Sequence, residues 1–463
     1  MEITTNAAKA AGLPEKERET LERLIKIHQA HAAKNAEKRR YYEGHVTVGE
    51  VNLGLALPNG IKSLEIGCAW GEKAVDVLAA RSRFDGFVGV NGEAAEMMTR
   101  IVAANQLVPA YNRSVRNELM LGCVFATLSA DRDIGCRIRF HGPEDGAAEW
   151  DGVKARIGNG FVVSDMAEKE DGQIVPVELQ LHTDTDVWII RRFNSDSDWR
   201  ALRMPHMLGR PMMEALCWNA TEDKPFGRSR LKYAVRKLIQ GYVRTVANAT
   251  IGLEFATAPQ KYMLGVTDEQ YDALINSKFK LYVGNILAAT TNNETGEKPT
   301  FGQLPQGSIE PHVQALRMLS AQFSAATGLT VTDVGVINDA NPTSSDAILA
   351  QSQTLILAAE DLNAGNAGAL YNIAQMAMAI AGNVRMDELS DEAKSIVPHF
   401  KSPAMPSVGV TADAAIKIAS AREGFSGTDV FLEMIGFDQA DIRRIKAQEA
   451  RSRGAALISE LES

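Results

Sequence analysis

The sequence predicts an α+β fold in which a strand-rich region is flanked by long helices. Short strand patterns fill residues 115–192, whereas apolar residues recur at helical spacing over 229–257 and a capping box opens an Ala-rich helix over 343–381. Strands that follow one another without intervening helices favour antiparallel, hairpin-rich sheets, because parallel strands need long crossovers. The 463 residues are enough for about three domains and a large core.

Composition and charge exclude several classes of protein. The 49 Lys and Arg residues against 58 Asp and Glu leave a formal net charge of −9, which disfavours a protein that grips nucleic acid or anionic membrane over its whole surface. No run of about 18 apolar residues and no apolar signal-peptide core occurs, so we expect a protein that folds in a cytoplasm and binds no membrane.

The cysteine and histidine residues give no metal-binding pattern. Four cysteines lack CxxC spacing, and we expect them to be ordinary buried thiols: Cys68, Cys123, Cys136 and Cys217. His28 and His31 lie one turn apart on a charged helical face without a further ligand, so we expect no metal site there. The sequence therefore predicts neither a metal nor a cofactor.

The first half of the chain begins with a helix and continues into strands. Apolar residues at helical spacing predict a helix from about Pro14 to Tyr42. Strand patterns then follow from about 115. In one of them the apolar residues Val177, Leu179 and Leu181 alternate with Glu178, Gln180 and His182, which predicts a sheet with one solvated face.

The second half is mainly helical, with one small β insertion. Residues 229–257 form an amphipathic helix that Pro259 ends, and short strand-like pieces follow. A second helix begins at Ser308 and ends at Gly328. After a polar loop, a helix runs from Thr343 to about Ala381 with an expected break at 365–368, and 411–460 forms short helices separated by glycines.

One short motif favours an enzyme, although two of its positions do not fit. Residues 64–72 resemble the cofactor-binding turn of S-adenosylmethionine-dependent methyltransferases, and Glu65, Gly67 and Gly71 match that turn. Ala69 replaces its middle glycine, and Asn91 stands where an acid would bind the ribose. No P-loop, HExxH or GxSxG motif accompanies it. A methyltransferase is therefore the alternative, and a protein that is not an enzyme is the main expectation.

Three segments in order resemble the portal proteins of tailed double-stranded-DNA bacteriophages, of the long-tailed type. Residues 226–265 are similar to the family's helix that closes with an Ala-Pro-Gln-basic-aromatic turn. Residues 308–336 are similar to its helix that ends in Thr-Gly before the channel loop, and 338–362 to its Asn-Pro-Thr-Ser segment, which opens the next long helix. The family's Val-Asp, Arg and Gly-Phe block matches 70–87, which overlaps the methyltransferase-like motif.

The resemblance implies a portal-type fold, assembled as a closed ring of about twelve subunits at one capsid vertex. It divides the chain into a mixed α/β wing, a two-helix stem, a small β clip, a tunnel loop and a helical crown. In chain order these are the wing (1–225), stem helix (226–258), clip (259–307), second stem helix (308–328), tunnel loop (329–345), wing with a long helix (346–405) and crown (406–463).

The implied function is a DNA channel for genome packaging, retention and ejection. The implied partners are further copies of the chain, the double-stranded DNA, the terminase large subunit, a head-completion adaptor, and the major capsid and scaffold proteins. The implied location is the virion, with host cytoplasm during assembly. We expect six residues of a polar loop at the channel constriction, with a plain surface connector as the alternative: Asn338, Asp339, Asn341, Pro342, Thr343 and Ser344.

Six basic residues at the first stem helix have two interpretations. They either pair with neighbouring subunits and solvent or present a basic face to DNA. Helical spacing spreads them around the helix, which favours pairing. They are Arg228, Arg230, Lys232, Arg236, Lys237 and Arg244.

Overall fold

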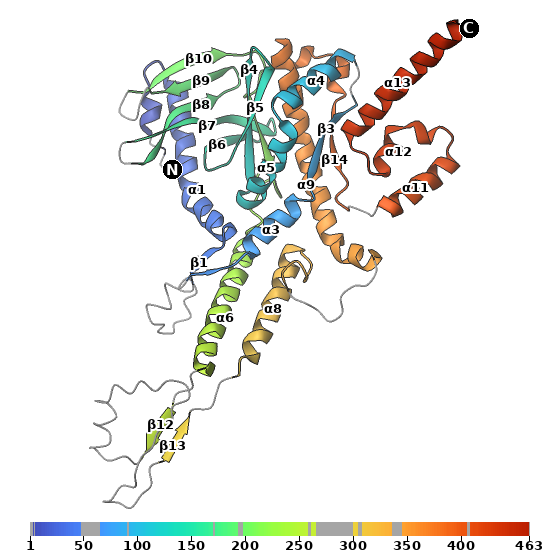
Figure 1. The fold of residues 1–463 in the computed structure, drawn as a ribbon. Coiled ribbons are helices and arrows are strands. Elements are labelled where there is room, and N and C mark those ends of the chain that lie inside the picture. The colour runs from blue at the N-terminus through green and yellow to red at the C-terminus, as the bar shows by residue number, and fades with distance from the viewer. Residues whose placement is uncertain are drawn as a thin grey trace, which may run out of the picture.

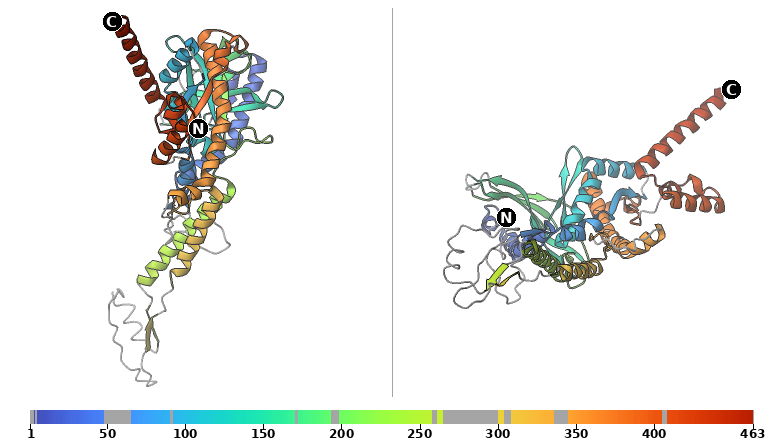
Figure 2. Two further views of the ribbon diagram at one scale, coloured as in Figure 1. Left: turned by 90° about the vertical axis from the view of Figure 1, so that its right-hand side faces the viewer. Right: turned by 60° about the horizontal axis from the view of Figure 1, so that its bottom comes forward.

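A mixed α/β body carries two projecting groups of helices (Figures 1 and 2). One is a helical hairpin that points away from the body, and the other is a C-terminal group that ends in a long helix (Figure 1). The computed structural model describes residues 3, 5–47, 65–89, 92–169, 172–192, 198–257, 261–264, 300–303, 308–335, 345–404 and 408–462.

Helix α1 (Glu15–Tyr42) confirms the predicted first helix, and a short 3-10 turn, η1 (Thr5–Lys9), precedes it. Pro14 fits the start of α1 because its fixed φ suits a helix and its missing N–H has no partner to lose there. Leu21, Leu24 and Ile25 form a buried stripe that packs on a sheet. The amphipathic spacing therefore sets which side of α1 faces the core.

Two antiparallel sheets stack behind α1. The first has five strands in the order β10-β9-β8-β7-β6, and the second has three in the order β11-β4-β5. The first sheet comprises β6 (Gly146–Asp151), β7 (Arg156–Glu168), β8 (Ile174–His182), β9 (Asp186–Arg191) and β10 (Arg200–Pro205). The second comprises β4 (Cys123–Asp131), β5 (Gly135–His141) and β11 (Met213–Cys217). The hairpin-rich antiparallel prediction is confirmed.

Two details of the predicted strand region are wrong. Strands begin at Cys123 rather than near 115, because Val115 and Leu119 belong to the buried face of helix α5 (Leu107–Leu121). The predicted solvated face of β8 also fails at His182, which is 0% exposed. The second sheet covers that face of the first, where Phe125 and Met213 meet Val162.

Helices cover the outer face of the second sheet and complete the main core (Figure 1). Helix α9 (Ser345–Gly382) lies against β4, β5 and β11, with α5 beside it. The expected break near 365–368 is wrong, because α9 is continuous. Gly365 and Gly368 face solvent, while buried Leu362 and Leu370 hold the helix on the sheet, and this packing outweighs about 1 kcal/mol of helix propensity lost at each glycine.

The remaining elements join the two ends of the chain. Strand β3 (Arg83–Val88) pairs with β14 (Val397–Lys401), so the first and last thirds share a sheet. Helices α3 (Trp70–Ala79) and α4 (Gly92–Ala104) flank β3. The C-terminal elements are η3 (Met386–Glu388), α10 (Asp391–Lys394), α11 (Val408–Ala421), η4 (Phe425–Gly427), α12 (Asp429–Met434) and α13 (Gln439–Glu462). The short C-terminal helices are confirmed except for α13, which has 24 residues.

The methyltransferase-like motif lies in a different structural setting from a cofactor-binding turn. Strand β2 (Glu65–Gly67) pairs antiparallel with β1 (His45–Thr47) in a separate two-stranded sheet. Within the described ranges every pairing between two of the strands is antiparallel, and the one parallel contact is an isolated bridge from Ala11 to Arg200, so a parallel sheet that would carry a cofactor turn is missing from them. Gly71 has a packing role instead, since a Cβ there would overlap the Tyr41 carbonyl.

A buried carboxyl group lies between α5 and α9. Glu118 is 0% exposed, and its Oε2 accepts a hydrogen bond from Asn366 Nδ2 at 2.8 Å. The same amide donates to Tyr111 Oη at 2.9 Å, which in turn meets Ser82 Oγ at 3.1 Å. Burial raises the pKa of Glu118 to about 8, against a smaller lowering by the Asn366 bond, so Glu118 is protonated at neutral pH.

Replacing Glu118→Gln should remove one source of pH-dependent stability. An ordinary carboxyl ionises near 4.5, so between pH 4.5 and 8 only the unfolded chain releases this proton. The free energy of unfolding then falls by up to about 1.4 kcal/mol per pH unit, and the contribution present below 4.5 is lost by pH 8. Urea unfolding at pH 5 and pH 8 measures this difference. The free energy of unfolding of the variant, relative to that of the parent, should be higher at pH 8 than at pH 5. Parallel pH profiles for the two proteins would contradict a buried neutral Glu118.

Candidate functional site: the stem and its junction with the body

Two antiparallel helices, α6 (Tyr233–Thr257) and α8 (Glu310–Thr327), form the projecting stem (Figures 1 and 2). Strands β12 (Lys261–Leu264) and β13 (Thr300–Gln303) pair at its far end. The predicted helices over 229–257 and 308–328, with strands between them, are therefore confirmed. Gly328 ends α8 with a φ of 69°, which a glycine adopts without strain.

An aromatic cluster fixes the stem to the body. Trp70, at the start of α3, lies 4.3 Å from Tyr242 of α6 and 4.5 Å from Phe323 of α8, measured between ring centroids. Phe323 is fully buried and Trp70 nearly so. Aromatic groups of this size remove a large apolar area from water, so one residue of the body holds both stem helices.

Arg230 joins three helices at the same junction. Its guanidinium is buried and donates from Nε to the Ala74 carbonyl of α3 and from Nη2 to the Thr327 carbonyl of α8. Thr327 lies in the last turn of α8, where carbonyls lack partners inside the helix and the helix dipole favours a cation. Burial lowers the pKa of Arg230 to about 10, so it keeps its charge at neutral pH.

Two further predicted basic residues have partners within the same chain. Arg236 pairs with Glu37 of α1 at 3.4 Å and donates to the Leu231 carbonyl at 2.8 Å. Arg228 meets Asp223 at 3.2 Å in an exposed pair. Both contacts connect the beginning of the stem to the body or to the segment before it.

The other three predicted basic residues differ in solvent exposure. Lys237 donates to Gln240 Oε1 at 2.9 Å and lies over the Tyr233 ring. Arg244 is 9% exposed and has an interaction partner, whereas Lys232 is exposed. The six residues therefore do not form one basic face. No sequence pattern indicated the structural role of Arg230, because its partners Ala74 and Thr327 lie far away along the chain and leave no local pattern.

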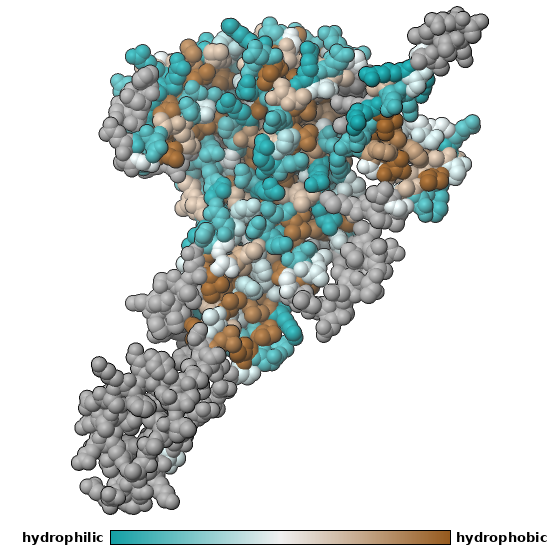
Figure 3. Space-filling model, viewed as in Figure 1, coloured by the Kyte–Doolittle hydropathy of each residue, from teal (hydrophilic) through white to brown (hydrophobic). Residues whose placement is uncertain are grey.

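Apolar side chains on the outside of the stem are left uncovered by this chain (Figure 3). Tyr233 is 69% exposed, Leu253 47% and Met318 56%. Val235, Ile239 and Val243 of α6 are buried near the body, whereas Leu253 lies about five turns beyond Val235 on the same side of α6 and is exposed there. An apolar surface on a projecting hairpin is typical of a protein–protein contact.

Several predicted features lie outside the described residues. These include the whole set proposed at the constriction: Asn338, Asp339, Asn341, Pro342, Thr343 and Ser344. The same holds for most of the predicted clip at 259–307.

The described residues were also compared with the predictions for metal binding, membrane spans and cysteine burial. Among them, no group of three or more His, Cys, Asp or Glu side chains could hold a metal ion. None of the helices searched in those ranges combines the length and apolar character needed to cross a membrane. Cys68, Cys123 and Cys136 are buried and Cys217 is half-buried, and burial raises the pKa of all four thiols.

Comparisons with known proteins give matches among solved structures but none among family models or curated sequences. No protein-family model and no curated protein sequence matches the chain. One similar solved structure is a virion of a native gene transfer agent particle, with 12% identity, a TM-score of 0.44, and coverage of 80% of this chain and 89% of that one.

Two neck structures are similar to the same extent. The neck of a native gene transfer agent particle computed with C12 symmetry has 13% identity, a TM-score of 0.41 and the same coverage. The neck of an empty particle computed with C6 symmetry has 11% identity and a TM-score of 0.44, covering 80% of this chain and 90% of that one. TM-scores below 0.5 do not establish a shared fold, so these matches carry no conclusion about this chain.

Replacing Arg230→Ala should loosen the stem from the body. The change removes donors from two carbonyl groups in a buried site, and we expect a loss of about 2 to 4 kcal/mol in the free energy of unfolding. Urea unfolding measures the loss, and hydrogen exchange should show faster opening at the end of α8. Arg228→Ala is the matched control, because its exposed pair is worth less than about 1 kcal/mol. Equal stability of the two variants would contradict the anchoring role.

Proposed function

We propose that this chain is the portal protein of a tailed double-stranded-DNA phage, forming a ring-shaped channel at one capsid vertex. Support comes first from sequence, since three segments in order resemble that family over nearly the whole chain. The observation that carries the proposal is the stem, in which two antiparallel helices project from an α/β body and hold a small strand pair at their far end. This is the arrangement that the resemblance implies for wing, stem and clip.

The uncovered apolar face of the stem supports assembly with further copies. A projecting hairpin of two helices has no interior of its own, so its outward apolar residues need a partner to leave water. A head-to-tail contact between identical copies closes into a ring when the rotation between them permits it. The proposed ring has about twelve subunits, with α6 and α8 of neighbouring copies packed side by side.

The charge of the chain is consistent with a channel that lets DNA slide through rather than one that binds it tightly. A channel wall that bound many phosphates would slow a sliding polyanion, because each phosphate contact adds affinity. Residues 330–400 carry nine acids but only two basic residues, Arg385 and Lys394. In the proposed ring, the polar residues of the loop at the constriction touch DNA through short contacts that do not anchor it: they are Asn338, Asp339, Asn341 and Thr343.

The basic residues of the stem have mainly structural tasks in this proposal. Arg230 and Arg236 connect α6 to the body of their own subunit. Lys232 and Lys237 have the exposure needed to meet a neighbouring subunit or DNA. The channel thus has no need of a continuous basic face.

The proposed role is structural and involves neither catalysis nor a cofactor. The ring would be a virion component, assembled in the host cytoplasm, that serves genome packaging, DNA retention and ejection. Its expected partners are the terminase large subunit, a head-completion adaptor, and the major capsid and scaffold proteins.

Replacing Met318→Asp should block assembly while leaving the subunit folded. Met318 is exposed within the chain, so a carboxylate costs little there until a neighbouring copy covers it. Sedimentation velocity should show rings for the parent and mainly monomers for the variant, with unchanged circular dichroism. Val153→Asp makes the same change in kind at a 97% exposed position in the turn between β6 and β7 and should leave the rings intact. A parent protein that sediments as a monomer at all concentrations would contradict the proposal.

A further inference from the structure

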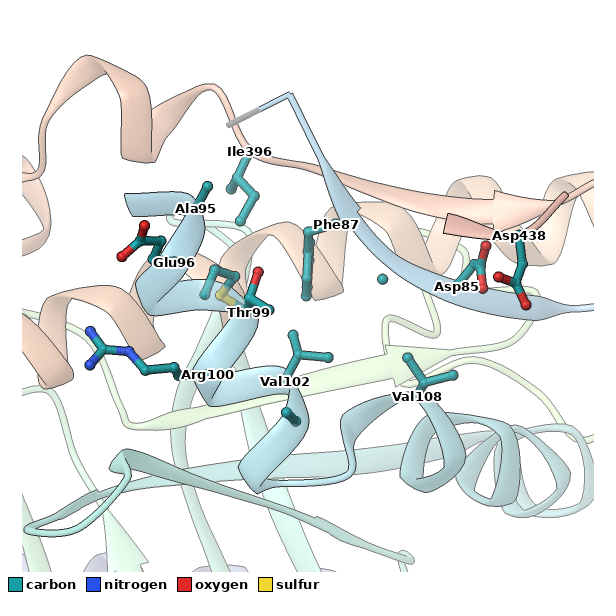
Figure 4. Close-up of a pocket in the computed structure, with 13 residues that line it drawn as sticks. Asp85, Phe87, Ala95, Glu96, Thr99, Arg100, Val102, Val108, Ile396 and Asp438 are labelled. Atoms are coloured by element: carbon teal, nitrogen blue, oxygen red, sulfur yellow. The ribbon is translucent and has the colours of Figure 1, made fainter. Parts of the chain in front are cut away.

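A cavity of about 840 Å³ beside α4 has charged groups that largely compensate one another (Figure 4). Asp85 and Asp438 lie close together in it, and both pair with Lys401, at 3.7 Å and 3.9 Å. Glu96 and Arg100 are neighbours one turn apart on α4. The lining therefore does not select a charged ligand.

Two of the four cysteines face each other across the second sheet. Cys123 of β4 and Cys217 of β11 are direct partners in the antiparallel ladder. The next pair along the chain is hydrogen-bonded, since the Trp218 N–H donates to the Gly122 carbonyl at 3.0 Å. Hydrogen-bonded and non-hydrogen-bonded pairs alternate along such a ladder, so Cys123 and Cys217 form a non-hydrogen-bonded pair, in which the side chains lie closer together.

This pairing brings the two thiols within the range of a disulfide. The Cα atoms of a non-hydrogen-bonded pair lie about 4.5 Å apart, and a disulfide joins residues whose Cα atoms are about 4.4 to 6.8 Å apart. Both side chains lie on the face of the second sheet that packs against the first, beside Phe125 and Met213. Both cysteines are free thiols in this structure. Rotation of the side chains can therefore bring the sulfur atoms together with little movement of either strand.

The two thiols differ in access to solvent and in their electrostatic surroundings. Cys123 is 6% exposed, whereas Cys217 is half-buried. Burial raises the pKa of both thiols, and the nearby Lys38 cation opposes that rise for Cys123. Lys38 is held in place by a hydrogen bond from Nζ to the Leu121 carbonyl at 2.9 Å. A small oxidant therefore reaches Cys217 first, while Cys123 has a cation near its thiolate.

We propose that Cys123 and Cys217 form a reversible disulfide when the protein meets hydrogen peroxide. The Cys217 thiolate attacks one peroxide oxygen and releases hydroxide, which leaves a sulfenic acid on Cys217. The Cys123 thiolate then attacks that sulfur and displaces a second hydroxide, and the sulfur–sulfur bond forms. The two thiol protons leave with the two hydroxides as water. Two thiols and one hydrogen peroxide thus give one disulfide and two water molecules, with two electrons passing to the peroxide.

The bridge joins the strand that follows α5 to the strand that leads to the stem. Cys123 begins β4, and Cys217 ends β11, after which the chain continues to α6. One backbone hydrogen bond already holds this connection, from the Arg230 N–H to the Leu119 carbonyl of α5 at 2.8 Å. A covalent link that closes a long stretch of chain restricts the unfolded state strongly in the chain-entropy model. The disulfide therefore stabilises the body at the point from which the stem departs.

The timing of the bridge rests on the proposed function. A virion component meets a reducing cytoplasm during assembly and an oxidising medium after release. The thiol form is then the one that assembles, and the disulfide form is the one that persists outside the cell. The chemistry of the pair itself does not depend on the ring.

Counting thiols in the purified full-length protein tests the pair. After treatment with hydrogen peroxide, the denatured parent should show two free thiols instead of four, and its digest should contain a peptide that links Cys123 to Cys217. Cys217→Ala should keep its three thiols, whereas the matched control Cys136→Ala should fall from three to one. A parent that keeps four thiols, or that loses thiols without the linked peptide, would overturn the disulfide.

Thermal unfolding measures the effect on the body. The oxidised parent should unfold about 5 °C higher than the reduced parent, and dithiothreitol should reverse the shift. Cys217→Ala should show no such rise after the same treatment. A linked peptide without a rise in the parent would overturn the stabilising role of the bridge.

Sedimentation of the same samples separates this inference from the proposed function. Rings whose subunits keep four free thiols after oxidation would overturn the disulfide and leave the proposed function standing. A monomer that yields the linked peptide would support the disulfide and contradict the proposed function.

Discussion

The attachment of the stem to the body depends on one buried cation. Arg230 is removed from water with no acidic partner in the part of the chain that the structure describes, and the carbonyls of Ala74 and Thr327 stabilise it. Because these carbonyls belong to α3 and α8, and Arg230 itself precedes α6, the group fixes the relative position of three helices. The Trp70 cluster adds apolar contact at the same point. The stem therefore projects as a continuation of the core rather than as a separate arm.

That attachment determines which surfaces remain for other copies. With the inner sides of α6 and α8 packed at the junction, Met318 of α8 faces outward, and Leu253 is exposed further along α6. At the other end of the molecule, α13 also leaves the body with its side chains exposed. A subunit with two uncovered projections on one rigid body is suited to repeated contacts around an axis. In the proposed channel, the uncovered faces of each subunit form the contacts with its neighbours.

Sequence patterns identified the long helices, but they did not predict features that depend on contacts between elements distant in the sequence. Helix α1 and the stem helices follow from local spacing and from stops such as Gly328, so they were predictable. The burial of His182 was not, since it depends on a second sheet that covers β8. The glycines at 365 and 368 suggested a break that the packing of Leu362 and Leu370 prevents. Arg230 carried no local signal, and its place in a basic run suggested DNA or subunit pairing instead of an internal bond.

An electron cryomicroscopy reconstruction of the purified full-length protein tests the central claim most directly. The account predicts closed rings with an axial channel, in which α6 and α8 of successive subunits pack side by side and residues 338–344 lie within about 15 Å of the bore, the limit of side-chain reach plus screened electrostatics. Particles that remain single subunits, or that assemble into open filaments without a central channel, would contradict it.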